Sequence, residues 1–316
     1  MQNSPHSHVV PTYGAKAQYV EADEVSTPLD KEGQKYIQAV TGTLLYYSRA
    51  VDPTILVALN AIATQQAAPT TKTMERVQQL LDYCASQEEA IITYHASDMV
   101  LAVHSDAGYL NERKSRSRAG GHFFLSSDVQ HPPNNGAILT IVQIIDAVMS
   151  SAAEAELGAL FINAKEAVYL RRILQEMGHR QPRTPIQTDN STAEGVINAR
   201  IRPKRTKSMD MRFEWLLDRA QQGQFKIYWR PSKTNLADYF TKHHPPAHHC
   251  NMRGDFLTRV AEVHRLRQEQ ARSSETSLAM TDRSCFRNFL QGCVNISVNS
   301  VRKLSENGSK YSSPNI

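Results

Sequence analysis

Apolar positions in the middle of the chain follow two patterns, short runs and longer stretches with helical spacing. Short runs bounded by turn residues predict strands, and spacings of three and four residues predict amphipathic helices. The predicted strands cover residues 99–103, 120–125, 137–145, 185–188 and 225–229. The predicted helices cover residues 152–177, a segment that begins near 191, and residues 209–221. Three consecutive strands followed by alternating helices and strands predict an α/β fold with a mixed sheet and helices on its faces.

The residues on either side of this region have a different character. Residues 1–35 are polar, contain three prolines and two glycines, and are predicted to be an irregular leader. Residues 36–97 carry three short stretches with helical spacing, which predict a separate helical segment without a catalytic group. The α/β region is predicted to span residues 98–245. Residues 246–316, which become rich in Ser, Asn and Arg, are predicted to be a weakly ordered tail.

The composition fits a globular protein rather than a membrane-spanning one. Hydrophobic residues make up 41% of the chain and charged residues 21%, and no run approaches the roughly 18 consecutive apolar residues of a transmembrane helix. The N-terminus lacks a basic segment followed by an apolar one, which argues against a secretory signal. The four cysteines are scattered and form no CxxC pair, which favours a reducing compartment. We expect an intracellular protein, cytoplasmic or nuclear or both, with no membrane partner.

Four acidic residues lie where an apolar run meets a turn or a helix start. They are Asp106 in HSDAGY, Glu156 in SSAAEAEL, Asp189 in QTDNS and Asp238 in NLADYFTK. A catalytic carboxylate needs such a place, because the backbone beneath it is rigid and the face above it is open. Four carboxylates brought together would repel one another strongly unless divalent cations lay between them. The pattern therefore predicts a Mg²⁺ site.

Two glutamates compete for the second position of this set. Glu154 and Glu156 are two residues apart, so on a helix they point in nearly opposite directions. Ser151 and Glu154 fit a capping box, which gives Glu154 a structural task at the helix start. Glu156 lies near the edge of the apolar helix face that packs on the sheet, and it is therefore the predicted ligand.

Basic residues are concentrated in two places, although the net charge of the chain is only +5. Residues 200–233 hold ten Lys and Arg against three acidic residues, a net charge of +7, and a second group contains Arg113, Lys114, Arg116 and Arg118. Such groups often form only a solvated face, but their position beside a predicted metal site favours a phosphate backbone as partner. The candidate nucleic-acid contacts are Arg113, Lys114, Arg202, Lys204, Arg205, Lys207, Arg212, Arg230 and Lys233.

Several of these motifs together resemble the ribonuclease H domain of copia-type LTR-retrotransposon Pol polyproteins. In the order of that family they are SDAGY, SRAGGHFFLS, SSAAEAELGAL, QTDNSTA, KRTKSMDMRFEWL and NLADYFTK. The resemblance covers residues 98–245 and implies a ribonuclease H-like mixed five-stranded sheet flanked by helices. Residues 36–97 resemble the segment that ends the reverse transcriptase and joins it to the ribonuclease. The chain thus resembles a C-terminal fragment of such a polyprotein.

The resemblance implies a Mg²⁺-dependent endonuclease that cuts the RNA strand of RNA–DNA hybrids. Matched motif by motif, its four carboxylates are Asp106, Glu156, Asp189 and Asp238, which hold two Mg²⁺ ions, with Mn²⁺ as the alternative metal. The expected partners are the hybrid and other Pol segments. The paired-Asp motif of the polymerase palm has no counterpart in the sequence, so we expect no reverse transcriptase activity from this fragment.

The resemblance leaves alternatives open. Many cellular ribonucleases H carry a mobile His before the last Asp, but residues 229–235 contain none, which implies a slower enzyme. A catalytically inactive nucleic-acid-binding relic is one alternative. A transposase of the same fold class is another, although its three-carboxylate site leaves Asp238 unexplained. The His and Cys residues of HHPPAHHC (243–250) are also candidate metal ligands, but they lack regular zinc spacing.

Overall fold

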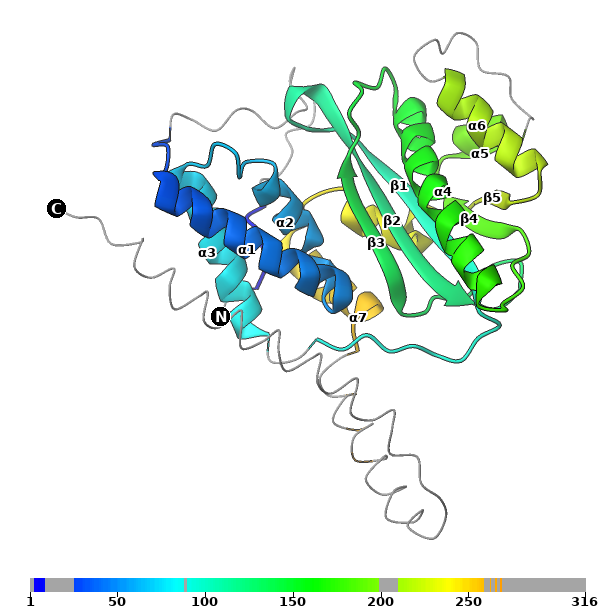
Figure 1. Cartoon of the computed structure of the whole chain (residues 1–316), viewed down its shortest axis with the longest axis horizontal. Helices are drawn as coiled ribbons and strands as arrows, with labels where there is room; N and C mark the ends of the chain where they lie inside the picture. The colour runs from blue at the N-terminus through cyan, green and yellow to red at the C-terminus, as the bar shows by residue number, and fades with distance from the viewer. Residues whose placement is uncertain are drawn as a thin grey trace, which may run out of the picture. The chain divides into compact units, whose positions relative to one another are not determined.

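The computed structural model describes residues 3–8, 26–87, 90–198 and 210–258, together with positions 262, 265 and 268. These residues form two compact units, which the chain connects at residues 93–94 and 244–245. The sheet unit comprises residues 94–244, and the helical unit combines residues before 94 with residues from 245 onward. In Figure 1 the sheet unit runs from cyan to yellow, and the first helices of the helical unit are blue and cyan.

The sheet unit is built on one five-stranded mixed sheet with the strand order β3-β2-β1-β4-β5. Its strands are β1 (Val100–Glu112), β2 (Arg116–Ser126), β3 (Ala137–Ile144), β4 (Thr184–Thr188) and β5 (Phe225–Trp229). The first three strands pair antiparallel, whereas β4 pairs parallel with β1 and with β5. Parallel pairs require crossover connections, which the helices supply. The predicted mixed five-stranded sheet, flanked and preceded by helices, is confirmed.

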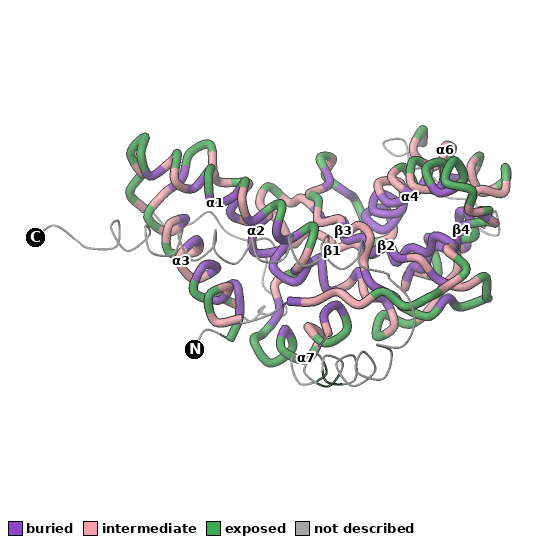
Figure 2. Tube along the Cα trace, turned by 60° about the horizontal axis from the view of Figure 1, so that its bottom comes forward, coloured by how far each residue is buried: buried purple, intermediate pink, exposed green. Residues whose placement is uncertain are grey.

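Three α-helices follow the antiparallel strands along the chain. They are α4 (Ala152–Glu176), α5 (Ser191–Ile197) and α6 (Asp210–Gln221). Their apolar sides share one core with the sheet, to which Val103, Leu160, Ile186 and Leu216 contribute. Figure 2 shows this core as purple stretches along the strands and along α4. The long helix α4 therefore has a fixed position on the sheet, because its inner face is buried apolar surface.

Two consecutive glycines in β2 allow close packing on both faces of the sheet. A Cβ at Gly120 would lie 2.5 Å from the backbone oxygen of Ala237, which belongs to the 3₁₀ helix η4 (Leu236–Phe240). A Cβ at Gly121 would lie 2.1 Å from Oδ1 of Asn163 on α4. Since neighbouring strand residues face opposite sides, η4 and α4 pack on opposite faces of the sheet at this point.

The structure corrects the predicted positions of two carboxylates. Asp106 lies within β1 and not at its end, because β1 continues as the partner of β2 and pairs Asp106 with Gly120. The strand β4, which pairs parallel with β1, ends at Thr188. Asp106 therefore lies just beyond the part of β1 that pairs with β4. Asp238 lies in the short 3₁₀ helix η4 and not in an α-helix. Both residues nevertheless lie near the end of β4, where β1 continues without a parallel partner.

Among the described residues, the helical unit includes α-helices from before the sheet unit and one from after it. They are α1 (Lys31–Ala50), α2 (Leu56–Ala63) and α3 (Thr71–Ser86), with the 3₁₀ helix η1 (Pro53–Ile55), and then α7 (Pro246–Phe256). Helix α1 begins five residues before the predicted start at 36, because the Asp30 carboxylate accepts a hydrogen bond from Gly33 N at 2.7 Å and caps the helix. Ile37, Leu59 and Leu80 are fully buried among these helices.

Helix α7 corrects the prediction that residues from 246 onward are weakly ordered. Its Arg253 forms an ion pair with the buried Asp52 at 2.6 Å, and its His249 contacts the hydroxyl of Tyr83 at 2.7 Å. Local patterns did not reveal this helix, because residues 246–256 include few apolar side chains and the helix makes its polar contacts with residues far earlier in the chain. The helical unit therefore includes residues from both sides of the sheet unit.

The predicted division into residues 1–35, 36–97, 98–245 and 246–316 otherwise stays a prediction. Among the helices that the structure describes, none has the length and apolar character needed to cross a bilayer.

Candidate active site

Asp106 extends from β1 toward the face of the sheet that η4 covers. It is 4% exposed and lies directly across the strand pair from Gly120, so the two share a face. Gly120 has no side chain on that face, and η4 approaches it closely. The pairing of β1 with β2 therefore fixes the backbone of Asp106. The carboxylate of Asp106 lies near the end of β4.

Glu156 approaches the same end of β4 from α4, which packs on the opposite face of the sheet. Its Oε1 accepts a hydrogen bond from Ala107 N at 3.2 Å, and its Oε2 accepts one from the Thr188 hydroxyl at 3.5 Å. One carboxylate thus touches both β1 and β4. Although it is an acid, Glu156 is only 6% exposed.

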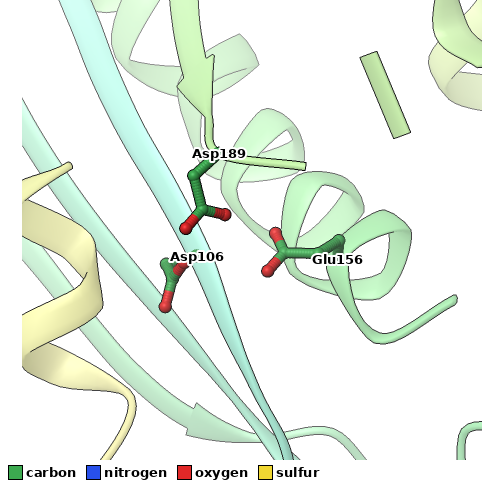
Figure 3. Close-up of side chains that lie close together, drawn as sticks. All are labelled: Asp106, Glu156 and Asp189. Carbon is green, nitrogen blue, oxygen red and sulfur yellow. The ribbon is translucent and has the colours of Figure 1, made fainter. Parts of the chain in front are cut away.

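Asp189 completes a group that we call the carboxylate cluster: Asp106, Glu156 and Asp189. Asp189 follows the last residue of β4 and precedes Asn190, the N-cap of α5. One carboxylate oxygen from each of the three residues lies within 4.8 Å of the others. Figure 3 shows the three side chains pointing toward one another from three different elements.

Burial and mutual repulsion raise the pKa of two members of the carboxylate cluster, Asp106 and Glu156. The pKa of Asp106 is raised to about 8, first by burial and then by the charges of Asp238 and Asp189, while Lys242 and a hydrogen bond with Thr241 oppose the rise. Burial, followed by the charges of Asp106 and Asp189, raises the pKa of Glu156 well above its ordinary value. Hard oxygen ligands crowded in this way suit Mg²⁺ or Mn²⁺, since a divalent cation would relieve the repulsion.

Asp238 lies beside the carboxylate cluster but outside the group of three that could share one ion among the described residues. Its charge is the largest charge effect on Asp106, and its Oδ1 accepts a hydrogen bond from Lys242 Nζ at 2.7 Å. The four predicted carboxylates thus converge on one region, with three in contact distance and the fourth paired with a lysine.

Glu154 points away from the carboxylate cluster. The Ser151 hydroxyl caps α4 by accepting from Glu154 N at 3.2 Å. The carboxylate of Glu154 accepts from the backbone N of Ser150 at 2.6 Å, one residue before the position that a standard capping box uses. The assignment of Glu154 to the helix start and of Glu156 to the cluster agrees with the structure.

Two buried asparagines that sequence patterns did not reveal hold the elements of the site. Asn163, two turns after Glu156 on α4, donates to Gly120 O at 2.9 Å and to the Ser105 hydroxyl at 2.8 Å. Asn235 donates to Ser105 O at 2.9 Å and caps η4 by accepting from Ala237 N. Both side chains bond β1 or β2 beside Asp106. In the sequence, Asn163 is marked only as a polar residue within the apolar face of the predicted helix, and this does not show which groups it bonds.

Gly120→Ala is expected to reduce the metal-dependent activity of the site by about 100-fold, because a displacement of about 1 Å in a catalytic group costs that much. The new methyl group would meet the backbone oxygen of Ala237 at 2.5 Å, so η4 and Asp238 must move. The measurement is the hybrid-cleavage rate described below.

The matched control is Gly158→Ala. This position lies on α4 next to the site, but its new Cβ would meet only side-chain carbons at 3.4 Å or more. A Gly120→Ala variant with full activity would show that Asp238 tolerates displacement.

The structure places the predicted basic contacts in several elements, and their contact with nucleic acid stays a prediction. Arg113 and Lys114 lie in the 3₁₀ turn η2 (Arg113–Ser115) between β1 and β2, and Arg212 lies over the ring of Phe161 at 5.6 Å. Arg230 follows β5, and Lys233 is exposed in η3 (Ser232–Thr234). The remaining candidates, Arg202, Lys204, Arg205 and Lys207, lie outside the described residues. Arg118 of the second basic group is buried in an ion pair with Glu112, so it does not face a ligand.

The histidines of HHPPAHHC have structural contacts. His244 Nε2 contacts Tyr239 O at 3.1 Å and its ring stacks on Tyr239. His249 contacts the Tyr83 hydroxyl. In the part of the chain that the structure describes, the carboxylate cluster is the only group of three or more such residues close enough to hold one metal ion.

Comparison with known proteins connects the chain to retrotransposon polyproteins. It is 27% identical over 207 residues to the retrovirus-related Pol polyprotein from transposon TNT 1-94 of Nicotiana tabacum, which covers 66% of this chain and 15% of that polyprotein. It is 22% identical over 247 residues to the Ty1-JR1 Gag-Pol polyprotein of Saccharomyces cerevisiae, covering 76% of this chain and 14% of the relative. The chain therefore spans about one seventh of the length of these relatives.

Solved structures of ribonucleases H show weaker likeness. LC11-RNase H1, solved in complex with an RNA/DNA hybrid, is 10% identical with a TM-score of 0.33 and covers 45% of this chain and 93% of that one. No protein-family model matches the chain. The relationship is therefore carried by the polyprotein sequences and not by the solved structures. Both relatives fit the copia type of retrotransposon that the sequence motifs predicted. The chain is homologous to a segment of the Pol polyproteins of copia-type retrotransposons.

Proposed function

We propose that this chain is a Mg²⁺-dependent endonuclease that cleaves the RNA strand of RNA–DNA hybrids. The observation that carries the proposal is the carboxylate cluster beside the end of β4, where β1 continues past it in the five-stranded mixed sheet. Three elements deliver the three acids to one place, at the cost of burying two of them. Such an arrangement is unfavourable for the isolated chain, and it is expected where cations bind.

In this proposal Asp106, Glu156, Asp189 and Asp238 hold two cations. When bound, two divalent cations lower the pKa of an attacking water and stabilise the leaving oxygen of the RNA strand. Glu156 is oriented by Ala107 N and by the Thr188 hydroxyl. Asn235 and Gly120 fix η4 and thereby Asp238. The protein's contribution is to hold these acids rigidly before the substrate arrives.

Basic side chains near the site support a nucleic-acid substrate. Arg230 and Lys233 follow β5, one strand away from Asp189, and the basic segment 200–233 carries a net charge of +7. Lys and Arg neutralise backbone phosphates, so hybrid binding should weaken steeply with salt. Discrimination of RNA from DNA requires a contact to the 2′-OH.

Purified protein should cut the RNA of a matched RNA–DNA hybrid in Mg²⁺ or Mn²⁺, and it should cut neither duplex DNA nor duplex RNA of the same sequence. Chelation by EDTA should stop the reaction, because the carboxylates act through the metal. The measurement is the rate of product formation from end-labelled strands.

The competing interpretation is a relic that binds nucleic acid without cleaving it. Hybrid binding without cleavage at any Mg²⁺ or Mn²⁺ concentration would establish that interpretation. Primer extension on a poly(rA) template belongs in the same experiment, and we expect none from this fragment.

A further inference from the structure

Trp229 occupies an unusual position beside the carboxylate cluster. It is the last residue of β5, and its register partner on β4 is Thr188, the residue immediately before Asp189. Its indole Nε1 donates a hydrogen bond to the backbone oxygen of Asp189 at 2.8 Å. The ring is therefore held at the edge of the site by both the strand pairing and this bond.

The indole is nevertheless 48% exposed. Its one polar atom is already bonded to the protein, so the exposed part of the ring is apolar. Phe225 and Ile227, which alternate with it on the same face of β5, are 2% and 3% exposed and belong to the core. At Trp229 the strand thus extends its apolar face beyond the core and into solvent, next to Asp189.

An exposed indole held in a fixed orientation is typical of a surface that packs against a ligand. The ligand here must also suit a Mg²⁺ site and the basic residues Arg230 and Lys233 that follow Trp229. A nucleotide meets both requirements, since its phosphate is anionic and its sugar and base have apolar surface. In an intact duplex the base faces are covered by their neighbours, so the surface left for the ring is the sugar.

We propose that Trp229 is a substrate-binding residue whose ring packs against the ribose of a nucleotide next to the scissile phosphate. This inference rests on the proposed hybrid cleavage and adds a contact to it. The RNA strand is the partner because Asp189, to which the ring is bonded, belongs to the cluster that acts on that strand. The contact orients the ribose, and the carboxylates perform the chemistry.

A purely structural role for Trp229 predicts different results. If the indole only holds the Asp189 carbonyl, loss of its N–H would disturb Asp189 and weaken metal binding. If the ring binds the ribose, loss of the ring would weaken hybrid binding and leave metal binding unchanged. Trp229→Phe keeps an aromatic ring without the N–H, and Trp229→Leu removes the ring, so the two variants separate the roles.

Trp229→Leu is expected to raise KM for the hybrid about 10-fold, which corresponds to about 1.4 kcal/mol, and to change kcat less than about threefold, since the ring contacts the ribose and not the reacting atoms. Trp229→Phe should stay within about threefold of the wild type. The Mg²⁺ concentration for half-maximal rate should be the same in all three proteins. The matched control is Tyr169→Leu, which removes another exposed ring, from α4, 13 residues after Glu156.

Fluorescence provides a readout that does not require cleavage. The chain has two tryptophans, so Trp215→Phe leaves Trp229 as the only indole, and Glu156→Gln in the same protein arrests the reaction. Adding hybrid in Mg²⁺ should shift or quench the Trp229 emission in parallel with the anisotropy of a labelled hybrid.

Hybrid binding by anisotropy with unchanged Trp229 emission would overturn the inference while leaving the proposed function intact. A shifted Mg²⁺ requirement in both Trp229→Phe and Trp229→Leu, with KM unchanged, would overturn it in favour of the structural role. If the wild-type protein neither bound nor cut the hybrid, both proposals would fail.

Discussion

Asp106→Asn is expected to abolish hybrid cleavage, by a factor on the order of 10³ or more, and at the same time to stabilise the metal-free protein. The first effect follows because an amide replaces an anionic metal ligand. The second follows because Asp106 is buried beside Asp189 and Asp238, whose charges disfavour its ionised form. At pH 8 the gain in unfolding free energy should be on the order of 5 kcal/mol, because each unit of the pKa rise from roughly 4 to about 8 corresponds to about 1.4 kcal/mol.

The pH dependence of stability has a definite sign. Asp106 has a pKa of about 8 in the folded protein, against roughly 4 for an unfolded Asp. Between these values the folded state holds the additional proton, so the unfolding free energy of the metal-free wild type falls as the pH rises from about 4 to about 8. Mg²⁺ should restore the stability that is lost, because it binds only the folded state. Asp106→Asn should show a weaker fall and a weaker response to Mg²⁺.

Thermal unfolding followed by tryptophan emission measures this effect in the sheet unit, which contains both Trp215 and Trp229. Glu176→Gln is the matched control, since it removes an exposed carboxylate from the far end of α4. If Asp106→Asn melted below the wild type at pH 8 without metal, burial and repulsion of the ionised Asp106 would not be destabilising the metal-free protein.

Arg253→Met is expected to destabilise the helical unit by about 3–5 kcal/mol, because it leaves a buried charge without its partner. Asp52 is 1% exposed and receives hydrogen bonds from Thr54 N at 3.0 Å and from Arg253 at 2.6 Å. Methionine keeps much of the length of arginine and removes the charge. The double variant Asp52→Asn with Arg253→Met should recover part of the loss, since no buried charge then remains.

Hydrogen exchange in peptides from α1 and α3 measures this loss, because the sheet unit provides all the tryptophan signal and should unfold as before. Arg49→Met, at an exposed position near the end of α1, is the control. Unchanged exchange in Arg253→Met would show that α7 is not needed by the helices that precede the sheet unit.

The sequence by itself determined most of the secondary structure and singled out the four acids, whose catalytic role stays a prediction. The strand predicted at 225–229 and the helix predicted at 152–177 match β5 and α4 closely, because binary patterns and caps are local properties. The distinction between Glu154 and Glu156 was also local, since two residues on one helix face opposite directions. These features needed only neighbouring residues to be predicted.

Only the tertiary structure decided how these parts meet. Asp106 continues inside β1 because β2 pairs with it, and the importance of Gly120 and Gly121 depends on η4 and α4 approaching from opposite faces. Asn235 bonds Ser105 across 130 residues, and Arg253 bonds Asp52 across 201. A polar side chain in the sequence does not reveal its partner at such separations. The partner is decided by the packing of the core. A buried charge or amide loses its hydrogen bonds to water, and this costs free energy unless a protein group replaces them.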